Sequence, residues 1–295
     1  MGGWDWGMWG PGWQARFHSC PRARLRSEPH MLSYRATLPV PLVVVRRVSA
    51  WLQAHRRARD IRPYQRAATC WTQAVLFLRW LIDATPVHRL ARDHGLSQAS
   101  TYRYLHEAIT VVADRQPGLH EVIAAQLDAD APFMCLDGTL IHTDRCRRPS
   151  TSGNDVWYSG KHHAHGGNIQ VLTDSTGFPI WTSPVEPGSV HDITAARAHA
   201  LPALYPAAAK GLPTLADKGY NGAGIGIKTP FKGHALDHGN RAYNRLQRAL
   251  RAPAERANAI LKDYRALRHV TLDPHRIGHI VAAALVIATM ARGRW

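Results

Sequence analysis

The chain has 295 residues, of which 45% are hydrophobic and 20% charged, enough for one large domain or two ordinary ones. Its 37 Lys and Arg residues against 21 Asp and Glu give a formal charge of +16, which indicates a polyanionic partner such as nucleic acid. Four scattered cysteines and a longest apolar run of only ten residues (281–290) exclude a disulfide-rich secreted scaffold and a membrane-spanning protein. We therefore expect a cytoplasmic protein without a membrane partner.

The first thirty residues differ from the rest of the chain. Four tryptophans fall within residues 1–13, among glycines and without a helical or strand period. No basic start precedes an apolar stretch, so the segment is a poor signal peptide. We interpret residues 1–30 as a disordered leader, or as translation called upstream of a true start at Met31, and a functional aromatic arm is the alternative.

Residues 31–127 have the apolar spacing of a helical domain. An acidic, proline-containing junction at 128–132 follows them and predicts a domain boundary. The expected helices span 42–59, 72–82, 87–94, 97–111 and 119–127.

The segment 87–108 (VHRLARDHGLSQASTYRYLHEA) carries the signature of a helix-turn-helix. Ala91 permits close helix packing, Gly95 a left-handed turn, and Ser97 can cap the second helix. The outward face of that helix is expected to present DNA-contacting side chains. These are Gln98, Ser100, Thr101, Arg103 and Tyr104. An ordinary helical hairpin, or one that serves dimerisation, is the alternative because the Ala–Gly spacing is common.

Beyond the junction the periodicity changes to that of an α/β domain, which we place at residues 131–293. Strands are predicted at 133–143, 168–174, 179–184 and 214–216. Helices are predicted at 192–204, 241–264 and 275–291.

Three acids in this second domain point to metal chemistry. Asp137 interrupts an apolar strand (CLDGTLI), where a buried carboxylate is costly unless a cation compensates it. Asp217 follows a short strand, and Glu255 lies on the long helix. Three carboxylates on two strand ends and one helix can hold two Mg²⁺ ions, which prefer oxygen ligands. The alternative is that these acids are merely solvated.

The helix around Glu255 carries a stripe of cations. Arg251 precedes Glu255 by four residues, Arg248 precedes it by seven, and Lys262 follows it by seven, so all four project from nearly one face. Such a stripe suits a metal ligand within a phosphate-binding surface. A salt-bridged, solvated helix face explains it equally well.

Several sequence blocks, in a fixed order, resemble a known family. The blocks are LDGT (136–139), WYSGKHHAHGGNIQVLTD (157–174), EPGSVHDITAAR (186–197), ADKGYNGAG (216–224) and ERANAILKDYRALR (255–268). They resemble bacterial insertion-sequence transposases of the DDE superfamily-endonuclease group, similar to Harbinger-type transposases. The resemblance covers nearly all of residues 31–290, and the helix-turn-helix lies where that family has one. It implies an RNase H-like catalytic domain, a mixed sheet flanked by helices, preceded by an all-α helix-turn-helix domain.

The resemblance also implies roles for individual residues. Asp137, Asp217 and Glu255 match the family's three catalytic, metal-binding acids. Two Mg²⁺ ions are the implied cofactor, with Mn²⁺ as a substitute. The family's pattern around the glutamate is Tyr, two residues, Arg, three residues, Glu, six residues, Lys. Arg251 and Lys262 fit it as DNA-binding residues, whereas Arg248 stands at the Tyr position.

Three further residues are candidates for supporting roles. Lys161, with the histidines after it, is expected to approach DNA. His191 and Asp192 belong to a block that recurs in the family. They are expected either to hydrogen-bond to the metal-binding residues without touching the metal, or to cap the helix that follows them.

The interpretation that unites these features is a transposase. It cleaves a phosphodiester at each transposon end with a metal-activated water, and the freed 3′-hydroxyl attacks target DNA. The expected partner is double-stranded DNA, bound by a homo-oligomer at the bacterial nucleoid. A non-catalytic helix-turn-helix regulator and a plain RNase H-like nuclease without strand transfer are the alternatives.

Overall fold

The computed structural model describes residues 37–146, 148, 149, 153 and 155–295. The prediction for residues 1–30 therefore lies outside the described residues. Leu38–Trp295 forms one compact unit, and it contains all the elements below.

The first half of this unit is helical, as predicted. Ser97 is the N-cap of the fourth helix, and its hydroxyl accepts a hydrogen bond from the Ser100 backbone N–H at 3.1 Å. Gly95, in the preceding turn, has the left-handed φ of +63° that the turn requires. The helices are α1 (Leu42–Ala58), α2 (Cys70–Asp83), α3 (Val87–Asp93), α4 (Gln98–Ala113) and α5 (Leu119–Asp128), with a 3₁₀ turn, η1 (Pro63–Gln65), between α1 and α2.

Two residues predicted on the outward face of α4 point inward instead. Thr101 is 0% and Tyr104 4% exposed. The Thr101 hydroxyl donates to the Ser97 carbonyl at 3.0 Å, and the Tyr104 hydroxyl accepts from the Ala68 N–H at 3.1 Å. The prediction was wrong for these two because α4 packs on both α2 and the C-terminal helix, which leaves it a narrower solvent face than a hairpin would have.

The strands of the described residues form one seven-stranded mixed sheet. They are β1 (Met134–His142), β2 (Tyr158–Ser159), β3 (Ala164–Thr173), β4 (Pro179–Thr182), β5 (Glu186–Pro187), β6 (Thr214–Ala216) and β7 (Ile227–Lys228). The order is β2-β3-β1-β6-β7, and β4 and β5 also pair with β3. β1 is antiparallel to β3 and parallel to β6, which is parallel to β7.

Helices cover both faces of this sheet. One face, with Leu136 and Leu172, packs on α5, α6 (Asp192–His199) and α7 (Leu201–Ala209). The other, with Ile141 and Val171, packs on α9 (Glu255–Lys262) and α10 (Ile277–Ala291). A mixed sheet flanked by helices is consistent with the predicted RNase H-like fold. The two-residue strands β2, β5 and β7 were not predicted because two residues show no period.

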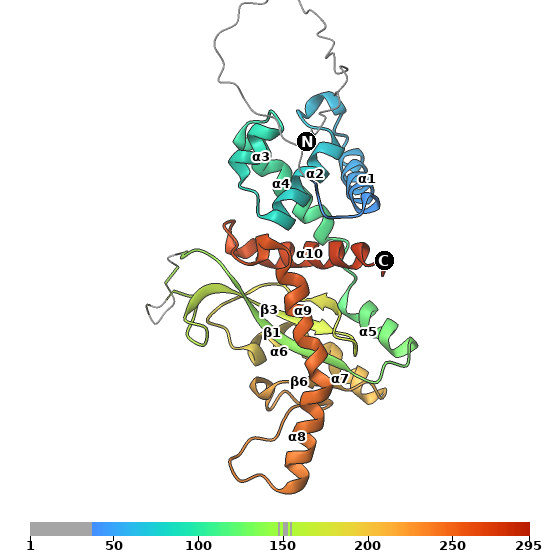
Figure 1. Cartoon of the computed structure of the whole chain (residues 1–295), viewed down its shortest axis with the longest axis vertical. Coiled ribbons are helices and arrows are strands. Elements are labelled where there is room, and N and C mark those ends of the chain that lie inside the picture. Colours follow the sequence, from blue (N-terminus) through green and yellow to red (C-terminus); the bar gives the residue numbers. More distant parts are fainter. Residues whose placement is uncertain (1–36, 147, 150–152, 154) are drawn as a thin grey trace, which may run out of the picture. The chain divides into compact units, whose positions relative to one another are not determined.

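Helix α10 joins the sheet to the first helices. It packs on β4 and α9 on one side and on α1 and α4 on the other, and Figure 1 shows it between them. In the described part of the chain, Pro274–Ala291 is long and apolar enough to cross a membrane by length and composition, and 67% of it is buried in the protein. The apolar surface of α10 therefore completes a core that both halves of the chain share. The boundary at 128–132 stays a prediction.

Two predicted helices are each interrupted. The helix expected at 192–204 is split at Ala200 into α6 and α7, and the second residue of α7 is Pro202. The helix expected at 241–264 consists of α8 (His238–Arg251), a 3₁₀ turn, η3 (Ala252–Ala254), and α9. Proline causes both interruptions because it lacks the N–H that would continue the helix, and Pro253 occupies the middle of η3.

Candidate active site

Asp137 and Asp217 lie side by side on neighbouring parallel strands. The register of β1 and β6 pairs Leu136 with Ala216, and each of these residues is followed by an acid. Both side chains therefore leave the same face of the sheet. Asp217 directly follows β6, and its Oδ1 accepts from the Gly219 backbone N–H at 2.7 Å. The structure thus brings together two of the three predicted acids.

The electrostatics of Asp137 favour a bound cation. Burial raises the pKa of its carboxyl group, and the nearby Arg251 guanidinium opposes this effect. The negative charges of Asp217 and, more weakly, Asp192 raise the pKa further. Neighbouring carboxylates repel each other when all are ionised, and a bound cation removes this repulsion.

The α8–η3–α9 segment lies over these two acids. Ala254, in η3, packs with Cys135 of β1 and Leu215 of β6, each two residues before an acid. Arg251 and Arg248 line a cleft of about 280 Å³ together with Asp217. Arg248, at the position where the family pattern has Tyr, therefore adds a cation beside the second acid.

Glu255 is close to this centre along the chain but does not contact it. It is the first residue of α9, directly after Ala254, and its side chain is exposed. Within the described ranges it forms no ion pair, including none with Arg251, and no three His, Cys, Asp or Glu side chains are placed to hold one metal ion. An exposed carboxylate stays hydrated instead of approaching two others when no cation is present.

Asn258, which the sequence analysis did not single out, makes the contact instead. Its Nδ2 donates to Asp137 Oδ2 at 3.2 Å, and its Oδ1 is buried with no hydrogen-bond partner in the described structure. Asn258 lies three residues after Glu255, so helical spacing places both on one side of α9. That spacing is the signal that would have identified it.

A second polar cluster lies on the opposite face of β1. Asp192, at the start of α6, accepts from Lys161 Nζ at 2.8 Å and from Asn168 Nδ2 at 2.8 Å. Gly138 makes this approach possible, because a Cβ there would lie 2.6 Å from Asp192 Oδ1. His191 is the N-cap residue of α6 but makes no side-chain capping bond. The Asp192 carboxylate therefore orients Lys161.

This cluster continues to the loop after Asp217. The Asn168 side-chain oxygen accepts from Gln170 Nε2 at 3.1 Å, and Gln170 Oε1 accepts from the Tyr220 hydroxyl at 2.7 Å. Tyr220 belongs to η2 (Lys218–Tyr220), which begins directly after Asp217. The hydrogen bonds thus couple the position of Lys161 to the loop that carries the second acid.

A cavity of about 670 Å³ adjoins the Lys161 side of the cluster. Its lining includes Tyr158, Lys161, His162 and His191. Burial lowers the pKa of His162, and the positive charges of Lys161 and, more weakly, Lys262 lower it further. Lys161 therefore gives the cavity a positive charge, and Lys262, at the end of α9, adds a weaker positive potential at His162.

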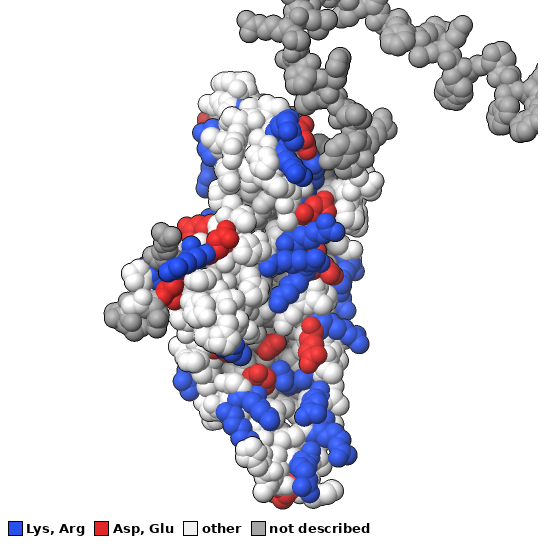
Figure 2. All heavy atoms as spheres, turned by 60° about the vertical axis from the view of Figure 1, so that its left-hand side comes forward, with Lys and Arg blue, Asp and Glu red and all other residues white. Residues whose placement is uncertain are grey.

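The DNA-contacting residues predicted on α4 are separate from the acids. Gln98 and Arg103 are exposed, and Ser100 is half-buried. Arg103 Nη2 donates to the Ser100 hydroxyl at 3.0 Å. Their role in DNA binding stays a prediction. Figure 2 shows that basic side chains surround a few acidic ones on the lower part of the face it presents.

Comparison with known proteins identifies the catalytic half. The family model described as DDE superfamily endonuclease matches residues 136–288, which begin one residue before Asp137 and extend into α10. The match includes Asp217 and Glu255. No curated protein matches the chain.

Proposed function

Because this chain belongs to the DDE superfamily endonuclease family, whose activity implies a DNA substrate, we propose that it is the transposase of a bacterial, Harbinger-like insertion sequence. The observation that carries the proposal is the position of Asp137 and Asp217, each directly after the last paired residues of the parallel strands β1 and β6, where the segment that leads into α9 packs through Ala254. This arrangement provides a rigid frame for metal-dependent cleavage of a phosphodiester.

The side chains at this centre fit a hard divalent cation. Asp137 and Asp217 supply carboxylate oxygens, and Asn258 adds a buried oxygen without a partner in the described residues. Glu255 is within one turn of Asn258 and is exposed, and we assign it as the third carboxylate ligand. Such oxygens are the ligands that Mg²⁺ prefers, with Mn²⁺ as a substitute. Two bound ions would supply activation of the attacking oxygen and stabilisation of the leaving oxygen.

The surrounding cations position the DNA strand. Arg251 lies near Asp137 and lines the cleft of Asp217, so its positive charge lets a phosphate approach the two acids. Lys161, held by Asp192, binds a phosphate at the cavity, and Lys262 binds one from the end of α9. His191 stays a candidate support at the start of α6. Residues on α4, Gln98, Ser100 and Arg103, bind the transposon end.

The reaction proceeds in two in-line displacements. A water oxygen attacks the phosphorus at the element's end, and the 3′-oxygen leaves as a hydroxyl after taking up a proton. That 3′-hydroxyl then attacks a phosphorus of target DNA, which transfers the strand and releases a target 3′-hydroxyl. Since the described residues contain one such centre and an element has two ends, we place a homo-oligomer on the DNA, in the cytoplasm at the nucleoid.

The test is a cleavage and joining assay with the purified full chain. The substrate is duplex DNA bearing the ends that flank the gene, with a target plasmid and either Mg²⁺, Mn²⁺ or a chelator. We expect metal-dependent nicking and joining. Cleavage without joining identifies a plain nuclease, and binding without nicking identifies a regulator, and either result overturns the transposase proposal.

A further inference from the structure

An arginine-lined cavity lies in the helical half, between the end of α1 and the start of α2. Its volume is about 680 Å³. We call it the arginine cavity and define it by Arg56, Arg57, Arg62, Arg66, Thr69 and Trp71. None of these residues belongs to the acidic centre or to the predicted DNA-contacting face of α4.

Arg56 is a buried cation without a counter-charge. It is only 7% exposed, and its Nη1 and Nη2 donate to the Ala68 carbonyl at 3.0 Å and to Gln73 Oε1 at 2.6 Å. Both acceptors are neutral, and Nε is buried with no hydrogen-bond partner among the described residues. No described carboxylate forms an ion pair with Arg56, although its guanidinium lies 5.7 Å from the centre of the Tyr104 ring. A buried charge without a partner is strongly destabilising, so this site gains from an anion.

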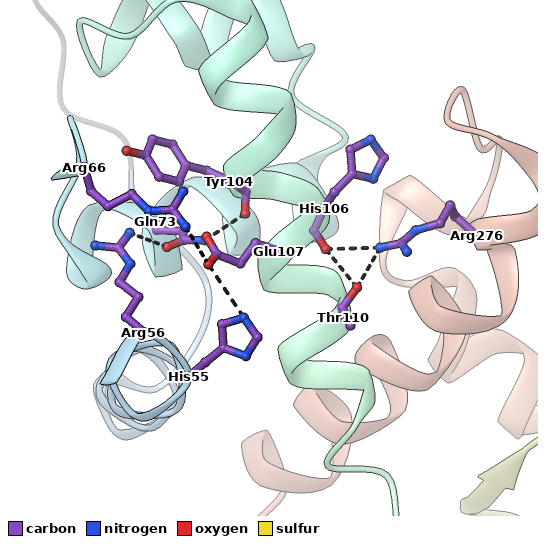
Figure 3. A network of polar contacts seen from close by, with 9 residues as sticks. All are labelled: His55, Arg56, Arg66, Gln73, Tyr104, His106, Glu107, Thr110 and Arg276. Atoms are coloured by element: carbon purple, nitrogen blue, oxygen red, sulfur yellow. Dashed lines mark hydrogen bonds and ion pairs between the residues drawn. The ribbon is translucent and has the colours of Figure 1, made fainter. Parts of the chain in front are cut away.

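The neighbouring acid, Glu107, does not fill that need. It accepts from Arg66 Nη2 at 3.2 Å and from Gln73 Nε2 at 3.0 Å, and His55 Nε2 lies 3.7 Å away (Figure 3). Burial and the charge of Arg59 lower the pKa of His55, which disfavours the charged form that would pair with Glu107. Arg66 therefore balances Glu107, and the charge of Arg56 remains in excess.

The remaining lining groups add positive potential. Arg57 and Arg62 are exposed, and the acid in the lining, Asp60, pairs with Arg62 at 3.5 Å where both are in solvent. Such an exposed pair contributes little and exchanges readily for a stronger ligand. Thr69 caps α2 by accepting from the Thr72 N–H at 3.1 Å, and the positive end of this 14-residue helix adjoins the cavity.

We propose that the arginine cavity binds a backbone phosphate of duplex DNA. The inference takes its partner from the proposed function, and the cavity itself selects a phosphate because several guanidinium groups and a helix N-terminus converge on it. The loop that lines the cavity contacts α4 through Arg66 and Ala68, at Glu107 and Tyr104. The cavity therefore lies beside α4, and the backbone of a duplex that contacts Arg103 can reach into it. Tyr64 and Trp71 are exposed on the same segment and suit contacts with sugars.

The first test compares two double variants that remove the same charge from the full chain. Arg57→Ala with Arg62→Ala alters the cavity, and Arg46→Ala with Arg47→Ala alters exposed positions elsewhere on α1. Binding to a labelled duplex is followed by fluorescence anisotropy over a range of salt. We expect the cavity variant to bind roughly tenfold more weakly, the size of one charge-assisted hydrogen bond, and its salt slope to fall by about 0.9 per lost phosphate contact. The control should change much less.

The second test is local. Cys70 lines the cavity, whereas Cys146 is exposed elsewhere. We expect the duplex to slow maleimide labelling of Cys70 in the parent, but not in the cavity variant, and to leave Cys146 unaffected, as measured by peptide mass spectrometry. A parent that binds no duplex overturns both this inference and the proposed function. A parent that binds while the two variants behave alike, or while Cys70 stays unprotected, overturns the cavity alone.

Discussion

The acidic centre on β1 and β6 and the arginine cavity between α1 and α2 have opposite charge imbalances. At the acidic centre, burial and the nearby Asp217 raise the pKa of Asp137, and Arg251 compensates only in part. In the arginine cavity, Arg56 is buried without a carboxylate partner in the described structure. Folded proteins rarely leave a charge unmatched in this way, so each imbalance indicates the ligand that completes the site: a cation in one and an anion in the other.

The two sites also differ in how they are supported. The acidic centre rests on strand register, because the pairing of Leu136 with Ala216 places the two acids side by side. The arginine cavity rests on side-chain hydrogen bonds that link α1, α2 and α4. We therefore expect substitutions to abolish function at the acidic centre with little effect on folding, and to change affinity by degrees at the cavity.

The largest effect is expected from removing one charge of the acidic centre. Asp137→Asn should reduce nicking below detection, because its amide cannot replace a carboxylate as a metal ligand. Its thermal stability without metal should be maintained, since the change removes repulsion from Asp217. Mg²⁺ should raise the Tm of the parent and not that of the variant. Equal Mg²⁺ stabilisation of the two proteins, measured by differential scanning fluorimetry, would remove Asp137 from the metal site.

Glu255 tests whether an exposed residue completes the centre. Glu255→Gln should also abolish cleavage, yet change the free energy of unfolding by less than about 0.5 kcal/mol because the side chain makes no described contact. Glu121→Gln is a control from another helix start. Nicking at the parental rate by Glu255→Gln would show that Asp137, Asp217 and Asn258 suffice without it.

Gly138 lies between the acidic centre and the Lys161–Asp192 pair, and its lack of a side chain leaves room for Asp192. Gly138→Ala places a Cβ 2.6 Å from Asp192 Oδ1 and should lower the free energy of unfolding by about 1–3 kcal/mol. Gly160→Ala is the matched control, because nothing lies within 4 Å of its Cβ. Urea denaturation measures both. A Gly138→Ala protein as stable as its control would mean that Asp192 has room to move away.

The smallest effect is expected on α4. Arg103→Ala should weaken duplex binding a few-fold, because Arg103 is exposed and its bond to Ser100 is local. In a variant that combines Arg103→Ala with the cavity substitutions, the losses in binding free energy should add to within about 0.5 kcal/mol if the two surfaces bind separate phosphates. Anisotropy titrations of the single and combined variants measure this sum. No loss from Arg103→Ala would take α4 out of the DNA interface.

The sequence by itself determined what depends on local chemistry. Apolar spacing located α1 to α5, and Gly95 and Ser97 marked the turn and the cap. An acid within an apolar strand identified Asp137, and the end of a short strand identified Asp217. These features follow from backbone preferences within a few residues, so a single chain reveals them. The prolines at 202 and 253 that interrupt two helices are also visible in the sequence, but the strong helical period around them led to continuous helices being predicted.

Only the tertiary structure decided which polar groups meet. Helical spacing predicted an outward Tyr104, but the Ala68 N–H donates to its hydroxyl, and the Arg66 guanidinium lies over its ring. Asn258 contacts Asp137 across 121 residues of chain, and Arg56 is buried because Ala68 and Gln73 close over it. Burial and long-range hydrogen bonds depend on how separate elements pack, and local propensity carries no information about that packing. The unmatched charges that define both sites are therefore properties of the fold.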